Sequence, residues 1–333
     1  PILSARPERQ KMPIFAQRSL PGITLKLHHL RDVIAVAEAG SLRAASRKSG
    51  LSQSTMTKSI QYLEKEIGAP IFERQQRGTV LTPLGALFVQ RARVATGELS
   101  RAREEIQQHL GGGDGRVVAC LSPVPHMALL PEVLPRFLER YPRVQLSVVE
   151  GLGFSAAENA LRDGEIDFYI GLGPGHSLPS EFVLEKLFDN ERCVVCRKGH
   201  PQAEATSLKD LMDARWSMSS PAFDDEEFAA LFQRHGLPVP SSRTFGGSIL
   251  GQIVFVLHAD ILAIVPRQWL AFAPLQGSIQ EVPIKETIGA PAIVMVRRAS
   301  LPLTPAAQHF CDLVRRASRH MPETLANVTA RPD

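Results

Sequence analysis

The stretch SLRAASRKSGLSQSTMTKSIQYLEKEIGAPIFER, residues 41–74, contains the pattern that decides the N-terminal fold. Ser41 and Ser52 are each placed to cap a helix, because a serine hydroxyl accepts a hydrogen bond from a free N–H at a helix start. Gly50 separates the two helical patterns, since glycine readily adopts the left-handed conformation at a helix end. The stretch therefore predicts two helices joined by a tight turn.

The second of these helices has an apolar face and a polar start. Its apolar positions recur at spacings of four, three and four, which is typical of a core stripe: Met56, Ile60, Leu63 and Ile67. The polar residues at its start are Ser52, Gln53, Ser54, Thr55, Thr57 and Lys58. In a helix-turn-helix such residues enter the major groove of DNA. Two ordinary packed helices with solvated tips remain the alternative reading of this pattern.

The flanking residues favour DNA binding. An amphipathic helix from Leu27, ended by Gly40, precedes the stretch, and residues 71–81 read as two short strands joined by a basic turn. This turn carries Arg74 and Arg77, and arginine suits phosphate because its planar guanidinium donates two parallel hydrogen bonds. Residues 41–93 contain 9 Lys/Arg against 3 Asp/Glu. A winged helix-turn-helix with a phosphate-binding face is the better interpretation.

Composition indicates a globular protein whose N-terminal part is basic. The chain has 333 residues, 44% of them hydrophobic, and no apolar run of membrane-spanning length. Residues 1–24, expected to be a basic tail, carry a net charge of +3, residues 25–110 carry +5, and residues 111–333 carry −4. The N-terminus lacks the pattern of a secretory signal. We therefore expect a cytoplasmic protein without a membrane partner. Any polyanion partner is expected to bind the basic N-terminal part of the chain.

A long linker helix is predicted over residues 83–110. Thr82 and Pro83 suit its start. An apolar stripe then recurs at three- and four-residue spacing, with one arginine within it: Leu84, Phe88, Arg91, Ala95, Leu99, Ala102 and Ile106. Such a stripe favours pairing with a second copy of the chain, although packing against its own chain remains open. A helix-turn-helix dimer implies a partly palindromic site on double-stranded DNA. Residues 111–115 are expected to form a hinge.

The rest of the chain alternates between strand and helix patterns. Strands are expected at 116–121, 144–149 and 166–170, with one helix at about 129–141 and another that ends near Arg162. This alternation predicts an α/β fold with a parallel sheet. Ligands of such sheets bind at the carboxyl ends of the strands, so we expect an effector near Ser122, Pro123, Val124, His126, Phe154 and Gly171.

Residues that carry enzyme or metal chemistry are scarce. Cys193 and Cys196 have metal-knuckle spacing, but no second pair completes four ligands, and the strand pattern places them on opposite faces. Ser122 precedes a proline and lacks the G-x-S-x-G frame of a nucleophile. Gly171-Leu-Gly173-Pro lacks the spacing of a dinucleotide loop. We expect no enzymatic activity, no cofactor and no metal.

Together these residues resemble the LysR-type transcriptional regulator family. The resemblance runs through AASRKSGLSQSTMTKSIQYLEKEIGAPIFERQQRGTVLTPLGALF, LLPEVLPRFLERYPRVQLSVVEG, LRDGEIDFYIG, the Gly199-His200-Pro201 turn and ILAIVP at 261–266. It covers residues 25–318 and implies groove and backbone contacts for Gln53, Ser54, Thr57 and Lys58.

The resemblance also implies the domain plan. A winged helix-turn-helix at 25–82 and the linker helix would precede a two-lobed, periplasmic-binding-protein-like effector domain at 116–318. Its first lobe would comprise 116–190 and 292–318, its second lobe 191–291, and 319–333 a tail. A homotetramer is expected, with RNA polymerase as a further candidate partner.

The second lobe adds candidate pocket residues for a polar or anionic effector: Ser219, Phe245, Ser248 and Pro266. Two other functions stay open at this point. One is a DNA-binding regulator that needs no ligand. The other, less favoured, is a two-lobed binding protein or enzyme without a regulatory role.

Overall fold

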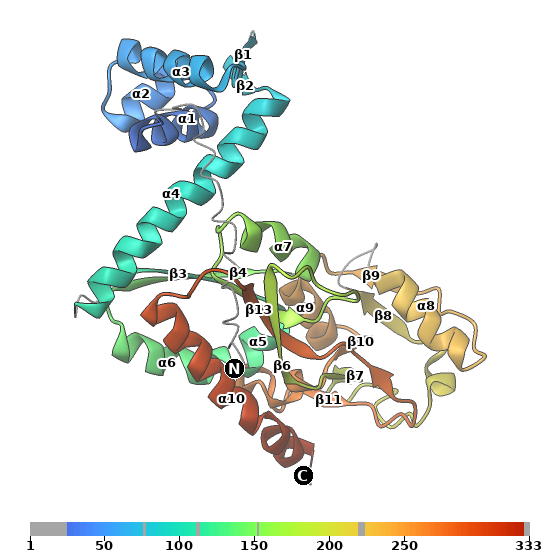
Figure 1. Ribbon diagram of the computed structural model, residues 1–333. Coiled ribbons are helices and arrows are strands. Elements are labelled where there is room, and N and C mark those ends of the chain that lie inside the picture. The colour runs from blue at the N-terminus through green and yellow to red at the C-terminus, as the bar shows by residue number, and fades with distance from the viewer. Residues whose placement is uncertain (1–24, 76–77, 111–113, 152, 219–223, 330–333) are drawn as a thin grey trace, which may run out of the picture. The chain divides into compact units, whose positions relative to one another are not determined.

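The computed structural model describes residues 25–75, 78–110, 114–151, 153–218 and 224–329 (Figure 1). The chain divides into two compact units, Pro1–Thr96 and Gly97–Asp333. The division falls within the long helix α4 (Pro83–His109).

The N-terminal unit is a three-helix domain with a wing. Its elements are α1 (Leu27–Ala39), α2 (Leu42–Ser49), α3 (Gln53–Ile67), β1 (Phe72–Gln75), β2 (Gly78–Leu81) and the first half of α4. Ser41 and Ser52 accept hydrogen bonds from the N–H groups of Ala44 and Thr55, each at 3.1 Å, so both predicted caps are confirmed. The predicted stripe is also confirmed: Met56, Ile60 and Leu63 are buried and Ile67 packs partly buried beside them.

The wing is fastened to this domain at both ends. The N–H of Thr79 donates to the carbonyl of Gly40 at 2.9 Å. Oε1 of Glu64 accepts the N–H groups of Ile71 and Phe72 at 2.8 and 3.2 Å. At the start of α4 the backbone of Gly85 lies against Ile71, and a Cβ there would lie 3.0 Å from Cα of Ile71 and closer still to its carbonyl. Only glycine permits this approach.

The C-terminal unit contains two sheets, each of which forms a lobe. The first lobe has the strand order β4-β3-β5-β13-β6. Its strands are β3 (Gly115–Leu121), β4 (Val144–Glu150), β5 (Phe168–Leu172), β6 (Phe182–Phe188) and β13 (Ile293–Arg298). Its helices are α5 (Pro123–Ala128), α6 (Leu130–Arg140), α7 (Phe154–Arg162) and α10 (Pro305–Thr329).

The second lobe has the strand order β11-β7-β10-β8-β9, with β12 also paired to β7. Its strands are β7 (Glu191–Arg197), β8 (Arg215–Met218), β9 (Arg243–Phe245), β10 (Ile261–Pro266), β11 (Ile279–Glu281) and β12 (Ile288–Gly289). Its helices are α8 (Asp224–Arg234) and α9 (Ile249–His258), with short 3₁₀ segments η1 (Leu208–Leu211), η2 (Arg267–Ala271) and η3 (Ala273–Leu275).

The expectation of a parallel sheet is right for three neighbouring strands in each lobe and wrong for the remaining strands. β4, β3 and β5 are parallel, as are β10, β8 and β9. β13 is antiparallel to β5 and β6, and β7 is antiparallel to β10, β11 and β12. The chain leaves the first lobe after β6 and returns along β13, so these neighbouring strands run in opposite directions.

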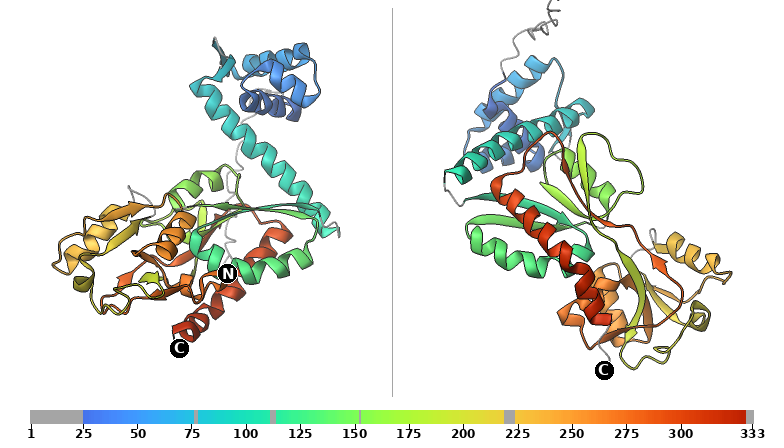
Figure 2. Two further views of the ribbon diagram at one scale, coloured as in Figure 1. Left: turned by 180° about the vertical axis from the view of Figure 1, so that it is seen from behind. Right: turned by 60° about the horizontal axis from the view of Figure 1, so that its bottom comes forward.

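Two contacts hold the lobes together. α5 of the first lobe packs against η2 of the second. α10 lies beside α6 (Figures 1 and 2) and packs against it, against β6 and also against η2. Met127 of α5 lies against the core cluster that contains Trp269 of η2. Two helices of the first lobe, α5 and α10, therefore pack against η2 of the second lobe.

The second half of α4 is attached to the first lobe through side chains. Oε2 of Glu104 accepts the N–H of Arg116 at 3.1 Å. Oε1 of Gln108 accepts the N–H of Ala306, at the start of α10, at 2.9 Å. These bonds cap the starts of a strand and a helix, so this part of α4 belongs structurally to the first lobe.

Candidate DNA-binding surface and effector site

The start of α3 presents a polar, exposed surface. Ser52, Gln53, Ser54, Thr55 and Lys58 are exposed and Thr57 is half-buried. The hydroxyl of Ser52 lies 2.8 Å from those of Ser54 and Thr55, and the hydroxyl of Thr57 donates to the carbonyl of Gln53 at 2.8 Å. The serine and threonine hydroxyls thus order the first turns of the helix. Gln53 and Lys58 extend from those turns into solvent.

A buried bond that the sequence did not reveal holds α3 in place. Ser59 of α3 donates a hydrogen bond to Oδ2 of Asp32 of α1, and the two residues are 7% and 6% exposed. A carboxylate is costly to bury unless it is paired, so this bond favours one orientation of α3 on α1. The only hint in the sequence is an aspartate beside the apolar Val33 and Ile34 on α1.

The basic wing lies partly outside the described residues. Arg74 is on β1, where its backbone pairs with Thr79 of β2. Arg77 lies outside the described residues. The wing therefore has the predicted strand pairing.

Of the seven residues in the stripe predicted on α4, Phe88 is half-buried and the other six are exposed. In the N-terminal half Val89 and Ala92 are buried in the helix-turn-helix core and Phe88 packs beside them. Leu84, Leu87, Leu99, Ile106 and Leu110 are exposed, at 59%, 54%, 56%, 59% and 77%. An exposed row of large apolar side chains on a helix is typical of a surface that packs against another molecule.

Ser122 and Gly171 lie together at the carboxyl ends of β3 and β5. The N–H of Ser122 donates to the carbonyl of Ile170 at 2.8 Å, and a Cβ on Gly171 would lie 2.8 Å from Cβ of Ser122. Ser122 precedes α5, with Pro123 as its first residue, and is 1% exposed. Its Oγ has no hydrogen-bond partner among the described residues. Nδ1 of His126 lies 3.0 Å from the carbonyl of Ser122.

The other predicted effector residues occupy different surroundings. Val124 and Phe154 are buried in two separate core clusters, and Phe154 packs edge-to-face on Tyr169. Pro266 is half-buried at the end of β10. Phe245 is 41% exposed at the end of β9, and Ser248 caps α9 by accepting the N–H of Gly251 at 3.1 Å. Ser219 lies outside the described residues.

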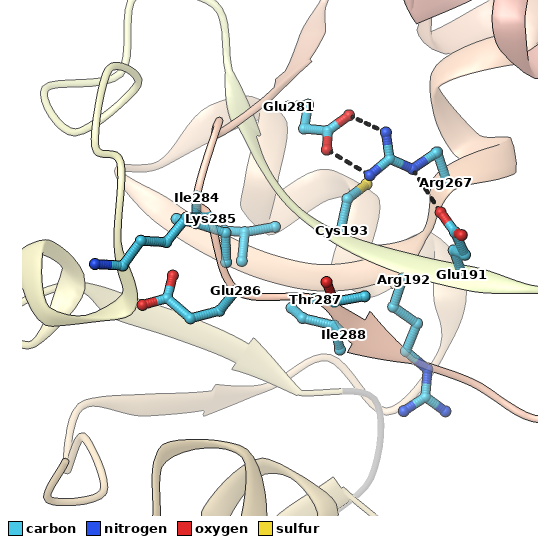
Figure 3. A pocket seen from close by; sticks show the side chains of 11 residues that line it. Glu191, Arg192, Cys193, Arg267, Glu281, Ile284, Lys285, Glu286, Thr287 and Ile288 are labelled. Atoms are coloured by element: carbon cyan, nitrogen blue, oxygen red, sulfur yellow. Dashed lines mark hydrogen bonds and ion pairs between the residues drawn. The ribbon is translucent and has the colours of Figure 1, made fainter. Parts of the chain in front are cut away.

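A cavity of about 220 Å³ in the second lobe was not foreseen from the sequence (Figure 3). Arg267 donates to both carboxylate oxygens of Glu281, at 2.9 and 3.1 Å, and its Nε lies 3.6 Å from Glu191. Burial raises the pKa of Glu281, against the opposing effect of Arg267. Arg192 pairs with Glu227, and Glu286 accepts the N–H of Leu208 at 3.1 Å. Arg192 and Arg267 are therefore both engaged in ion pairs, and we interpret this cavity as part of a structural network of charges.

The four cysteines are buried free thiols. Cys193 and Cys196 belong to core clusters on opposite faces of β7, as the strand pattern predicted. Burial raises the pKa of the Cys196 thiol to about 11, which disfavours the reactive thiolate. Among the described residues no three His, Cys, Asp or Glu side chains are grouped to hold a metal ion. None of the helices in the described part of the chain is both long and apolar enough to cross a membrane.

A winged helix-turn-helix, a long helix with exposed apolar residues and a two-lobed α/β domain define a class: one-component DNA-binding regulators. Residues 27–86 match the family described as "Bacterial regulatory helix-turn-helix protein, lysR family", and residues 111–319 match the "LysR substrate binding domain". The chain therefore belongs to the LysR family. It is a DNA-binding transcriptional regulator with an effector-binding domain and not an enzyme.

Known relatives match nearly the whole chain. The HTH-type transcriptional regulator GbpR of Azospirillum brasilense is 28% identical over 298 residues, covering 88% of this chain and 87% of the relative. The regulator GalR of Pseudomonas putida is 28% identical over 301 residues, covering 89% and 75%.

Solved structures show the same fold. Full-length CbnR bound to its target DNA has a TM-score of 0.63 at 21% identity and covers 88% of this chain and 100% of that one. Full-length OxyR from Pseudomonas aeruginosa has a TM-score of 0.62 at 20% identity, covering 89% and 95%.

Proposed function

We propose that α3 reads its operator through Gln53 and Lys58, with Ser52, Ser54, Thr55 and Thr57 ordering the helix start and contacting the DNA backbone. The observation that supports this assignment is the exposed start of α3 combined with its buried anchor, Ser59 on Asp32. Gln53 suits an adenine edge, which its amide can meet with two hydrogen bonds, and Lys58 suits guanine or phosphate. Arg74 and Arg77 on the wing would add phosphate contacts.

The exposed apolar residues of α4 support pairing of two chains, and we propose a dimer that assembles further into a tetramer on a partly palindromic promoter site. The protein would act in the cytoplasm, where it meets DNA, with RNA polymerase as a further partner. A small polar molecule bound between the lobes, near Ser122 and Gly171, would favour one arrangement of the assembly. A coupling free energy of about 1–3 kcal/mol is enough to change promoter occupancy.

The assignment of α3 is tested by titrating full-length protein against two DNA fragments at one fixed salt concentration. One fragment carries the operator recovered by selection from random DNA, and the other has a scrambled sequence. Gln53→Ala is expected to weaken operator binding by about 1–3 kcal/mol while leaving scrambled DNA nearly unaffected, because base contacts carry the specificity.

Lys58→Ala is the matched comparison on the same helix face. If Lys58 contacts phosphate, its loss weakens binding to both fragments. It also reduces the slope of log affinity against log salt concentration by about one, since about one counterion fewer is released. Equal losses on both fragments for Gln53→Ala would refute its role in recognition.

A further inference from the structure

One carboxylate joins the wing to α3. Oε1 of Glu64, near the end of α3, accepts the N–H of Ile71 at 2.8 Å and that of Phe72 at 3.2 Å. Ile71 is 1% exposed, and Phe72 is the first residue of β1. A buried N–H that loses its partner is costly to the fold, so these two bonds fix the place where the wing begins.

The same point of the chain is also tied to the start of α4. The connection from α3 passes through Pro70, which has no N–H, so the N–H groups of Ile71 and Phe72 are the first two that follow it. Both bond to Glu64. The carbonyl of Ile71 accepts the N–H of Thr82, directly before α4, at 2.9 Å. Ile71 is therefore a junction between α3, the wing and α4.

α3 acts as a rigid spacer between its polar start and Glu64. Gln53 and Glu64 are eleven residues apart on this helix, which corresponds to about 16 Å along its axis. Arg74 lies two residues beyond Phe72 on β1. The structural path from Gln53 to Arg74 therefore runs along α3, through the hydrogen bonds of Glu64, and into β1.

We propose that Glu64 is a positioning residue for DNA binding. Its carboxylate holds β1 at a fixed distance from the start of α3, so that Arg74 meets a phosphate while Gln53 meets a base. This inference rests on the proposed roles of Gln53 and Arg74. The charge of Glu64 by itself repels DNA, so a positioning role predicts an effect on affinity opposite in sign to that of the charge.

The first arm of the test separates the length of the side chain from its charge. Glu64→Gln keeps the reach and one acceptor oxygen, whereas Glu64→Asp keeps the charge and is shorter by one methylene group. Full-length proteins are titrated against the operator fragment at one fixed salt concentration. Glu64→Asp is expected to bind at least about tenfold more weakly. Glu64→Gln is expected to bind about threefold more weakly, because a neutral acceptor forms weaker hydrogen bonds than a carboxylate.

Glu73 provides the matched control, since it is an exposed glutamate on β1 itself. Glu73→Gln is expected to bind DNA equally or more tightly because it removes a negative charge, and Glu73→Asp is expected to bind like wild type. The proposal would be overturned if Glu64→Asp bound like wild type, or if Glu64→Gln bound as tightly as Glu73→Gln. Should Glu64→Asp fail to fold, as judged by circular dichroism, the comparison of the two glutamine variants decides alone.

The second arm asks whether Glu64 acts through the wing. Arg74→Ala is expected to weaken binding to the operator and to the scrambled fragment, and to reduce the slope of log affinity against log salt concentration by about one. In that background Glu64→Asp should cost less than about threefold in affinity, because no wing contact remains to be misplaced. A further tenfold loss would show that Glu64 supports the fold only, and would overturn the positioning role.

Failure of this inference is distinguishable from failure of the proposed function. An Arg74→Ala protein that binds DNA normally would refute the wing contact itself, and the positioning role with it. An effect of Arg74 that does not depend on Glu64 would refute the positioning role alone. Base recognition by Gln53 is judged separately by its own titration.

Discussion

Nη2 of Arg101 lies 2.9 Å from Oδ1 of Asp167, which links the linker helix α4 to the strand region before β5. The same nitrogen donates to the carbonyl of Gly164 at 2.7 Å, and the other oxygen of Asp167 accepts the N–H of Val118 at 2.7 Å. Arg101 and Asp167 are 17% and 9% exposed, so water and salt screen this pair weakly. Arg101 therefore fastens the second half of α4 to the first lobe.

Removing Arg101 should destabilise the C-terminal unit. Arg101→Ala leaves Asp167 as a buried carboxylate without its cation, which typically costs about 3 kcal/mol. We expect the urea midpoint of that unit to fall accordingly. The control is Arg136→Ala, whose ion pair with Glu132 is 58% and 38% exposed and contributes about 0–1 kcal/mol. A similar loss of stability in both variants would contradict the greater importance of the Arg101–Asp167 pair.

Introducing charge on the exposed row of α4 should prevent self-association. Leu99 and Ile106 are two helical turns apart, at 56% and 59% exposed. Ile106→Asp should change unfolding by no more than about 0.5 kcal/mol, because the residue is exposed in the single chain. Sedimentation should show a shift to smaller species and weaker operator binding. Gln107→Asp adds the same charge one residue away, and an identical effect there would argue against the row as the interface.

Acid should destabilise the second lobe through His200. Burial lowers the pKa of His200, with Asp260 opposing it, and its Nδ1 accepts the N–H of Gln202 at 3.0 Å. The unfolded chain takes up a proton near the ordinary value of about 6.5, whereas the folded protein resists it. The stability contributed by neutral His200 is therefore complete above that pH and declines as the pH falls toward the lower, folded value.

The measurement is the urea midpoint at several pH values between 7.5 and 5. His200→Gln should flatten the decline. Burial also lowers the pKa of His29 and His309, so part of the slope should remain. An unchanged slope in the variant would exclude His200 as a source.

Features that depend on neighbours along the chain were predictable. The caps at Ser41 and Ser52, the glycine ends of α1 and α2 and the core stripe of α3 follow from local hydrogen bonding and from helix periodicity. The opposite faces of Cys193 and Cys196 follow from the alternation of a strand. The antiparallel pairing of β6 and β13 could not be predicted in this way, because it depends on the chain returning from the second lobe to lie beside β6.

The sequence by itself determined the class of protein, its helix-turn-helix and the polar residues at the start of α3, because these are properties of short, periodic segments. Only the tertiary structure decided that Ser59 meets Asp32 and that Arg101 meets Asp167. Each of these relationships joins residues distant in the chain. Their pairing depends on burial and on close approach in space, which spacing along a sequence does not encode.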